Sequence, residues 1–186
     1  MSLSDGKRAA GLGRASSRGF TLVELVITLA VLAILVTLAV PAFTTLVNNN
    51  RLTAQANELV ADIQAARSEA VKLNQRVTLC PSTDNATCSG TNWGNRIMTV
   101  PAGAGVAVLR TSTAKGVLVV RGDAASVVFR PDGFARNAAG GLLAAQFTVC
   151  LPTTSPERNT RQIQLAAGSR LATSSAAYTT AGACPP

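Results

Sequence analysis

Residues 22–43, LVELVITLAVLAILVTLAVPAF, are the most apolar stretch of the chain. As an α-helix, a run of about 22 residues measures about 33 Å, close to the hydrocarbon thickness of a bilayer, ~30 Å. The run contains one charge, Glu24, and residues 1–19 before it carry four basic residues and one acid. The positive-inside rule therefore predicts a membrane span with the N-terminus in the cytoplasm and everything after Phe43 on the other side.

Two simpler interpretations of this run remain open, a cleaved secretory signal and a plain single-span anchor. The run is longer than the apolar core of a secretory signal, about 7–15 residues, and Val40-Pro41-Ala42 is a weak cleavage site. Neither interpretation gives a reason for Glu24, because an acid inside a membrane is costly and usually has a partner or a task.

Residues 18–25, RGFTLVEL, resemble the processing and assembly signature of type IV pilins and type II secretion pseudopilins. The resemblance implies that a prepilin peptidase cuts after Gly19 and methylates the new N-terminal Phe20. It makes Glu24 the fifth residue of the mature chain, the position at which the family carries its assembly glutamate. Pro41 also fits the family, whose helix often loosens near that position. A cationic amine on Phe20 and Glu24 of a neighbouring subunit can neutralise each other in a low-dielectric helix bundle.

A helical period continues beyond the span and predicts one long helix over residues 21–74, with its first half in lipid. Its second half is predicted to be amphipathic, with charged residues off the apolar stripe at Arg51, Glu58, Asp62, Arg67 and Glu69. The stripe, which we expect to seat a sheet, consists of Leu46, Leu52, Ala56, Leu59, Ile63, Ala66, Ala70 and Leu73.

From Arg76 onward the pattern changes to short strands separated by Gly, Pro, Asp or Asn. Loops are predicted at 137–141 and 153–156, a turn at 129–134, and a low-complexity tail at 172–182. The layout is α+β, a long helix packed on an antiparallel sheet, which is the pilin fold. The predicted strands are 77–80, 96–100, 106–110, 117–121, 127–130, 146–151 and 161–165.

These patterns divide the chain into four parts. Residues 1–19 are the expected leader, 20–43 the membrane and assembly helix, 44–75 the amphipathic helix of the head, and 76–186 a β-rich periplasmic head domain. We therefore expect an inner-membrane protein that enters a pilus or pseudopilus. Its expected partners are the prepilin peptidase, the membrane and other pilins or pseudopilins.

Beyond the N-terminus, the chain is similar to pseudopilin H and the FimT/FimU-type minor pilins. The supporting segments are short but span most of the mature chain. They are AARSEA at 65–70, VTLCP at 77–81 with a second cysteine before Trp93, FRPDG at 129–133, FTVC at 147–150, and the late Cys184.

The four cysteines contain no C-x-x-C pair, so disulfides are favoured over a metal site if the domain is exported. Three connectivities are open, and free thiols in a cytosolic core are the alternative. Turn residues between Cys80 and Cys88 favour a local bridge, which leaves Cys150 to pair with Cys184.

Arginines dominate the basic excess of the C-terminal half, where residues 90–186 hold nine basic and three acidic residues. Such a half attracts phosphate or acidic partners, which makes DNA binding in natural transformation the alternative function. The candidate residues are Arg158, Arg161 and Arg170, with Arg161 expected on the buried face of its strand. The Gly-Arg-x-Arg element of DNA-binding FimT-type pilins is not reproduced, because residues 168–171 read GSRL.

The sequence argues against an enzyme and against a resident metal or cofactor. It contains no histidine, so the abundant Ser and Thr have no imidazole to activate them, and it shows no phosphate-binding loop. Nine acids spread over the chain do not form a metal cage. No small-molecule substrate is expected, and the favoured function is that of a structural subunit of a fibre.

Overall fold

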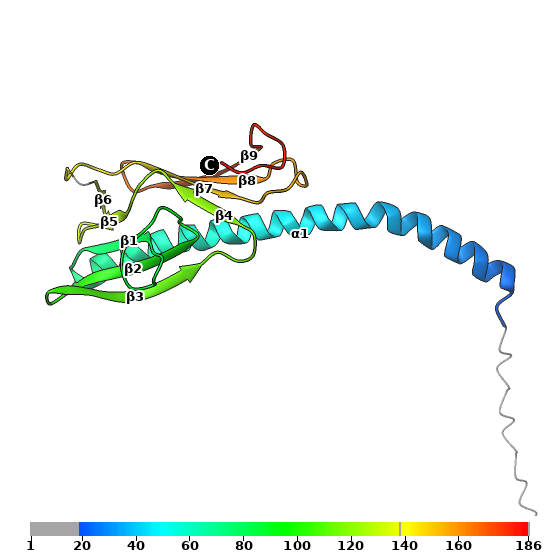
Figure 1. The fold of residues 1–186 in the computed structure, drawn as a ribbon, viewed down its shortest axis with the longest axis horizontal. Coiled ribbons are helices and arrows are strands. Elements are labelled where there is room, and N and C mark those ends of the chain that lie inside the picture. Colours follow the sequence, from blue (N-terminus) through cyan, green and yellow to red (C-terminus); the bar gives the residue numbers. More distant parts are fainter. Residues whose placement is uncertain (1–18, 138, 186) are drawn as a thin grey trace, which may run out of the picture. The chain divides into compact units, whose positions relative to one another are not determined.

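The computed structural model describes residues 19–137 and 139–185 (Figure 1). The chain forms two compact units. The first unit extends to Val40 and the second begins at Pro41. Helix α1 (Leu22–Leu73) begins in the first unit and ends in the second. Pro41 lies at the division and has no amide hydrogen to donate to the carbonyl of Thr37. Most of the predicted leader, residues 1–18, lies outside the described residues.

Local sequence sets both ends of α1. At the start, the hydroxyl of Thr21 accepts a hydrogen bond from the amide of Glu24 at 3.2 Å, as an N-cap residue does. At the end, Asn74 adopts a left-handed conformation with φ 51°. The amides of Asn74 and Gln75 donate to the carbonyls of Val71 and Ala70, which is a Schellman motif. The helix therefore ends within one residue of its predicted end.

The predicted apolar stripe of α1 is buried in its middle and exposed at its ends. Leu46 and Leu73 are exposed, so the expectation was wrong at these two positions. The larger part of the stripe packs into the core of the second unit, at Leu52, Ala56, Leu59, Ile63, Ala66 and Ala70.

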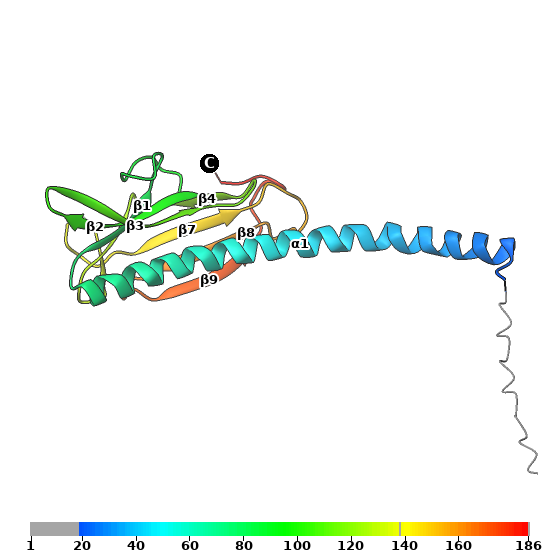
Figure 2. The same ribbon diagram turned by 90° about the horizontal axis from the view of Figure 1, so that it is seen from below.

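Two antiparallel sheets pack with this helical stripe around one core (Figures 1 and 2). The first sheet has the order β3-β2-β1-β5-β6 and consists of β1 (Val77–Pro81), β2 (Asn95–Ala102), β3 (Gly105–Thr113), β5 (Val127–Phe129) and β6 (Ala135–Arg136). The second has the order β4-β7-β8-β9 and consists of β4 (Val119–Gly122), β7 (Ala145–Cys150), β8 (Thr160–Leu165) and β9 (Leu171–Ala176).

Trp93 anchors the junction between the two sheets. Its ring meets that of Phe147 edge to face, with the ring centroids 4.7 Å apart, and its Nε1 donates to the carbonyl of Ala124 at 3.0 Å. Gly122 makes room for this pair, because a Cβ there would lie 2.7 Å from both Trp93 Nε1 and Phe147 Cδ1. The predicted α+β fold is confirmed, and all seven predicted strands are present with small shifts of their ends.

Two strands were not predicted. β6 has only two residues, too few for any periodic pattern. β9 lies almost wholly where a low-complexity tail was expected, and that expectation was wrong for residues 172–176, which pair in register with β8. β9 is an edge strand of small and polar residues that supplies backbone hydrogen bonds, and its middle four residues are exposed. Its sequence therefore lacks the apolar alternation by which a strand is recognised.

Candidate assembly site

The first unit presents a helix surface that is apolar and exposed. Phe20 is 79% exposed and Leu22 78%, and the other described side chains of α1 as far as Val40 are exposed as well. Among the described residues, α1 is the one helix that is long and apolar enough to cross a membrane. An apolar surface of this size is stable in contact with lipid or with other protein, not with water.

Glu24 is the one charged residue on this surface. The hydroxyls of Thr28 and Thr37 donate to the carbonyls of Leu25 and Ile34 at 2.8 and 2.7 Å, so these polar groups are satisfied within the helix. Within the described part of the chain, the carboxylate of Glu24 has no hydrogen bond or ion pair. Its place in the first turn puts the negative charge at the positive end of the helix dipole.

A buried ion pair joins the helix to the first sheet in the second unit. Arg96 of β2 is 0% exposed, and its Nη2 and Nε lie 2.5 and 2.7 Å from Oδ2 of Asp62, which is 1% exposed. The half-exposed Arg110 of β3 approaches the other carboxylate oxygen with its Nε at 3.2 Å, and Glu58 lies 3.8 Å from Arg96. One carboxylate on the helix thus ties two strands to it.

Asp62 was expected to lie off the apolar stripe, and this expectation was wrong, because its side chain is buried. Asp62 lies three residues after Leu59 and four before Ala66, a spacing that puts all three on one helix face. This spacing is the sign in the sequence that Asp62 lies on the buried face, although a charged side chain is rarely buried without a partner. Nothing in the sequence marks Arg96, in a different element, as the partner.

Both cysteine pairs favoured by the sequence form disulfides. Cys80–Cys88 closes an exposed loop after β1, and Cys150–Cys184 joins the end of β7 to the C-terminal segment. The side-chain amide of Asn159 donates to the carbonyls of Leu151 and Ala183, which supports the second bridge. In the residues that the structure describes, no cysteine is free.

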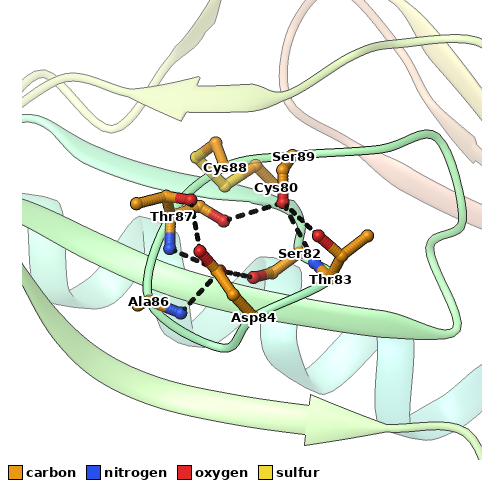
Figure 3. Close-up of a disulfide and its surroundings, with 8 residues drawn as sticks. All are labelled: Cys80, Ser82, Thr83, Asp84, Ala86, Thr87, Cys88 and Ser89. Carbon is orange, nitrogen blue, oxygen red and sulfur yellow. Dashed lines mark hydrogen bonds between the residues drawn. A yellow bond between two sulfur atoms is a disulfide. The ribbon is translucent and has the colours of Figure 1, made fainter.

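Asp84 organises the loop that Cys80–Cys88 closes (Figure 3). Its carboxylate accepts hydrogen bonds from the amides of Ala86 and Thr87 at 2.9 and 2.8 Å, and from the hydroxyls of Thr87 and Ser82 at 2.7 and 2.9 Å. The backbone amides of Thr87 and Ala86 contribute most to holding the pKa of Asp84 well below its usual range. The loop is therefore closed by a disulfide and held by hydrogen bonds between its own residues.

The structure separates the three arginines proposed for DNA. Arg158 and Arg161 lie at the start of β8, whereas Arg170 lies in the turn beyond its other end. Arg161 is half-buried, as expected, and donates to Asn49 Oδ1 of α1 and to two nearby carbonyls. Burial lowers the pKa of Arg161. Because one strand length separates the two ends, Arg170 lies apart from Arg158 and Arg161.

A family profile described as "Type II transport protein GspH" matches residues 55–169, which is more than half of the chain. The chain belongs to the GspH family. A second profile, "Prokaryotic N-terminal methylation motif", matches residues 14–40. No curated protein matches the sequence.

Solved structures of two proteins share the GspH-family fold of this chain. The type IV minor pilin FimU of Pseudomonas aeruginosa is 22% identical, with a TM-score of 0.52 over 67% of this chain and 88% of that one. The minor pseudopilin EpsH of Vibrio cholerae is 10% identical, with a TM-score of 0.50 over 67% of this chain and 97% of that one. The resemblance to pilins and pseudopilins is thereby confirmed.

The GspH match covers the buried ion pair and three of the four cysteines, and we expect the ion pair to govern the stability of the head. Asp62→Ala leaves the buried Arg96 with only Glu58, 3.8 Å away, to offset its charge and should lower the free energy of unfolding by about 3–5 kcal/mol. Glu58→Ala, at the rim of the same network, should cost less than about 1 kcal/mol. Chemical unfolding of the full chain in neutral detergent measures both. Equal losses would show that Asp62 is not the anchor.

The two disulfides should differ in their contribution to stability. Cys150 and Cys184 are 34 residues apart and Cys80 and Cys88 only 8, so the chain-entropy relation gives roughly 4 and 2.5 kcal/mol. We expect Cys150→Ser with Cys184→Ser to lower the unfolding midpoint more than Cys80→Ser with Cys88→Ser. Non-reducing peptide mapping of the membrane-extracted chain provides the control, and a Cys80–Cys150 linkage would contradict the pairing.

Proposed function

We propose that this GspH-family chain is an assembly subunit of a type IV pilus or of a type II secretion pseudopilus. The observation that carries the proposal is Glu24, a single charge on an exposed apolar helix that begins at Leu22, two residues after Phe20. A carboxylate in that position has no structural partner within the described chain. A neighbouring subunit in a helix bundle can supply one.

The proposal begins with processing. Cleavage after Gly19 removes residues 1–19 and creates a positive amine on Phe20, four residues before Glu24. Methylation of that amine keeps its charge. The N-methylation profile over residues 14–40 supports this step, as does the Arg18-Gly19-Phe20 sequence within it. The prepilin peptidase is thus the first proposed partner of the chain.

Membrane insertion precedes assembly. Residues 20–43 cross the inner membrane in this proposal, and the basic leader holds the N-terminus on the cytoplasmic side, because positive residues are retained there. The head is then periplasmic. An oxidising compartment suits the two disulfides, since such bonds persist outside the cytoplasm.

Assembly then follows from electrostatics in a medium of low dielectric constant. A lone carboxylate in lipid is expensive, and so is a lone ammonium group, because neither is solvated there. Pairing the Phe20 amine of one subunit with Glu24 of another removes both costs at once. The remaining surface of the helix is apolar and packs equally well against lipid or another helix, so this charge pair selects the assembled state.

Mass spectrometry of the membrane-extracted chain tests the processing step. We expect the mature protein to begin at N-methyl-Phe20 and to lack residues 1–19. Gly19→Val, which introduces a branched side chain at the cleavage site, should leave the leader attached. A wild-type chain that begins at Met1, or one cut near Ala42, would contradict the processing proposal.

Substitution of Glu24 tests the assembly step. Glu24→Ala removes the carboxylate from an exposed helix position, so the change in head stability should be negligible while entry into fibres is lost. Thr28→Val is the matched control, because it changes a polar residue of the same helix whose hydroxyl is already satisfied. Immunoblotting of sheared fibres against membranes measures both, and normal incorporation of Glu24→Ala would overturn the mechanism.

A further inference from the structure

A basic groove lies on the first sheet, on the face that points away from α1. Val77 and Phe129 form one registered pair of β1 and β5, so Arg76 and Arg130 lie at the next position outward and opposite each other. Arg136 of β6 pairs with Val128, on the same face. Together these residues line a cavity of about 490 Å³.

The positive charge of this groove is largely unneutralised. In the described ranges, Arg76 and Arg130 have no ion pair, whereas Arg136 pairs with the nearby carboxylate of Asp132, with its Nη2 at 2.8 Å. The hydrogen bond from Arg136 lowers the pKa of Asp132. Like charges opposite each other on neighbouring strands destabilise a sheet. The arrangement therefore favours an incoming anion.

Arg136 differs from Arg76 and Arg130 in its surroundings. Its Nε is buried and has no hydrogen-bond partner among the residues that the structure describes. Because that atom is closed to solvent, an incoming carboxylate meets the exposed Arg76 and the half-buried Arg130, where it can form charge-assisted hydrogen bonds.

The lining between the arginines is mainly apolar and composed of small side chains, with Asn137 as a polar member. Ala124, Ala125, Val128 and Leu143 line the cavity, together with the hydroxyl-bearing Ser126. A bare phosphate or a nucleic-acid backbone has nothing to place against such a surface. A polypeptide in which acidic and apolar residues are interspersed fits both parts, with its carboxylates on the arginines and its apolar side chains against Val128 and Leu143.

Two further arginines line a different cavity. Arg67 of α1 packs at the 130–134 turn, with its Nε 3.4 Å from the place that a Cβ on Gly133 would occupy. Arg67 and Arg170 line this second cavity, of about 520 Å³, which shares no lining residue with the groove.

We propose that the Arg76–Arg130–Arg136 groove binds an acidic, partly apolar segment of a different subunit in the fibre. This inference rests on the proposed function, because it takes the partner from the same assembly. A second copy of this chain does not offer such a segment. Its acids stand singly in the sequence apart from Glu58 and Asp62, which belong to the buried ion pair.

Binding of a designed peptide to the full-length chain in neutral detergent tests the groove. The probe is a fluorescein-labelled peptide, GDLEVDLEG, and fluorescence anisotropy reports its binding. Two control peptides separate the contributions of charge and apolar contact, GNLQVNLQG with amides for the acids and GDGEGDGEG with glycines for the apolar residues. We expect the first peptide to bind more tightly than either control, and binding to weaken with added salt.

Variants then locate the site. Arg76→Gln with Arg130→Gln should weaken binding of the acidic peptide by at least about tenfold, since each arginine contributes charge-assisted hydrogen bonds. Arg158→Gln is the matched control, an exposed arginine at the start of β8, and should leave the affinity unchanged. Retention of both disulfides in the double variant shows that it is folded.

Three outcomes would overturn the inference. They are an absence of peptide binding, equal binding by the double variant, and displacement of the peptide by inorganic phosphate or a 20-base-pair DNA duplex at equal or lower concentration. The last outcome would assign the groove to phosphate groups. Fibre incorporation of Glu24→Ala tests the proposed function separately. Failure of the peptide assay with Glu24-dependent assembly intact would overturn the groove alone.

Discussion

The buried face of α1 from Leu52 to Ala70 is the constraint on which the head depends. Both sheets complete their cores against it, and neither has another helix to pack on among the described residues. Three of its six buried apolar positions are alanines, which let the strands approach the helix backbone closely. Buried apolar area drives this packing at about 25 cal/mol per Å². The position of every surface feature of the head follows from how the two sheets lie on this face.

The buried ion pair inside that core orients the helix relative to the strands. Asp62 faces two arginines from adjacent strands, so the carboxylate fixes the rotation of the helix relative to β2 and β3. A buried ion pair is weak evidence of net stabilisation, because desolvation offsets the attraction. The pair excludes any packing that leaves Arg96 or Asp62 buried without a charged partner. The apolar stripe provides the attraction, and the ion pair selects one arrangement among those the stripe allows.

Local patterns predicted the fold well because they are strong here. The long helix, seven strands and the favoured cysteine pairs follow from periodicity, turn residues and the spacing of four cysteines. β9 was missed because an edge strand of Ser, Thr and Ala gains its stability from pairing with β8 and has no apolar period of its own. The basic groove was missed for a related reason. Arg76, Arg130 and Arg136 come from three strand ends, and only the register of β1, β5 and β6 brings them together.

Glu24 and the basic groove, two unneutralised regions within the described part of the chain, have opposite sign and different physics, and this difference suits them to different tasks. Glu24 lies on an apolar helix, where attraction to a cation is strong, little screened by salt and insensitive to the rest of the partner. In the proposed assembly, such a contact drives polymerisation with any subunit that offers an N-terminal amine. The arginines of the groove lie at the surface of the head, where salt weakens attraction and the apolar lining adds a requirement for shape. Contacts of that kind discriminate between partners, because a neighbour without matching acids gains little there. In the proposed fibre, the helix therefore supplies affinity for any subunit, and the head decides which subunit lies beside it.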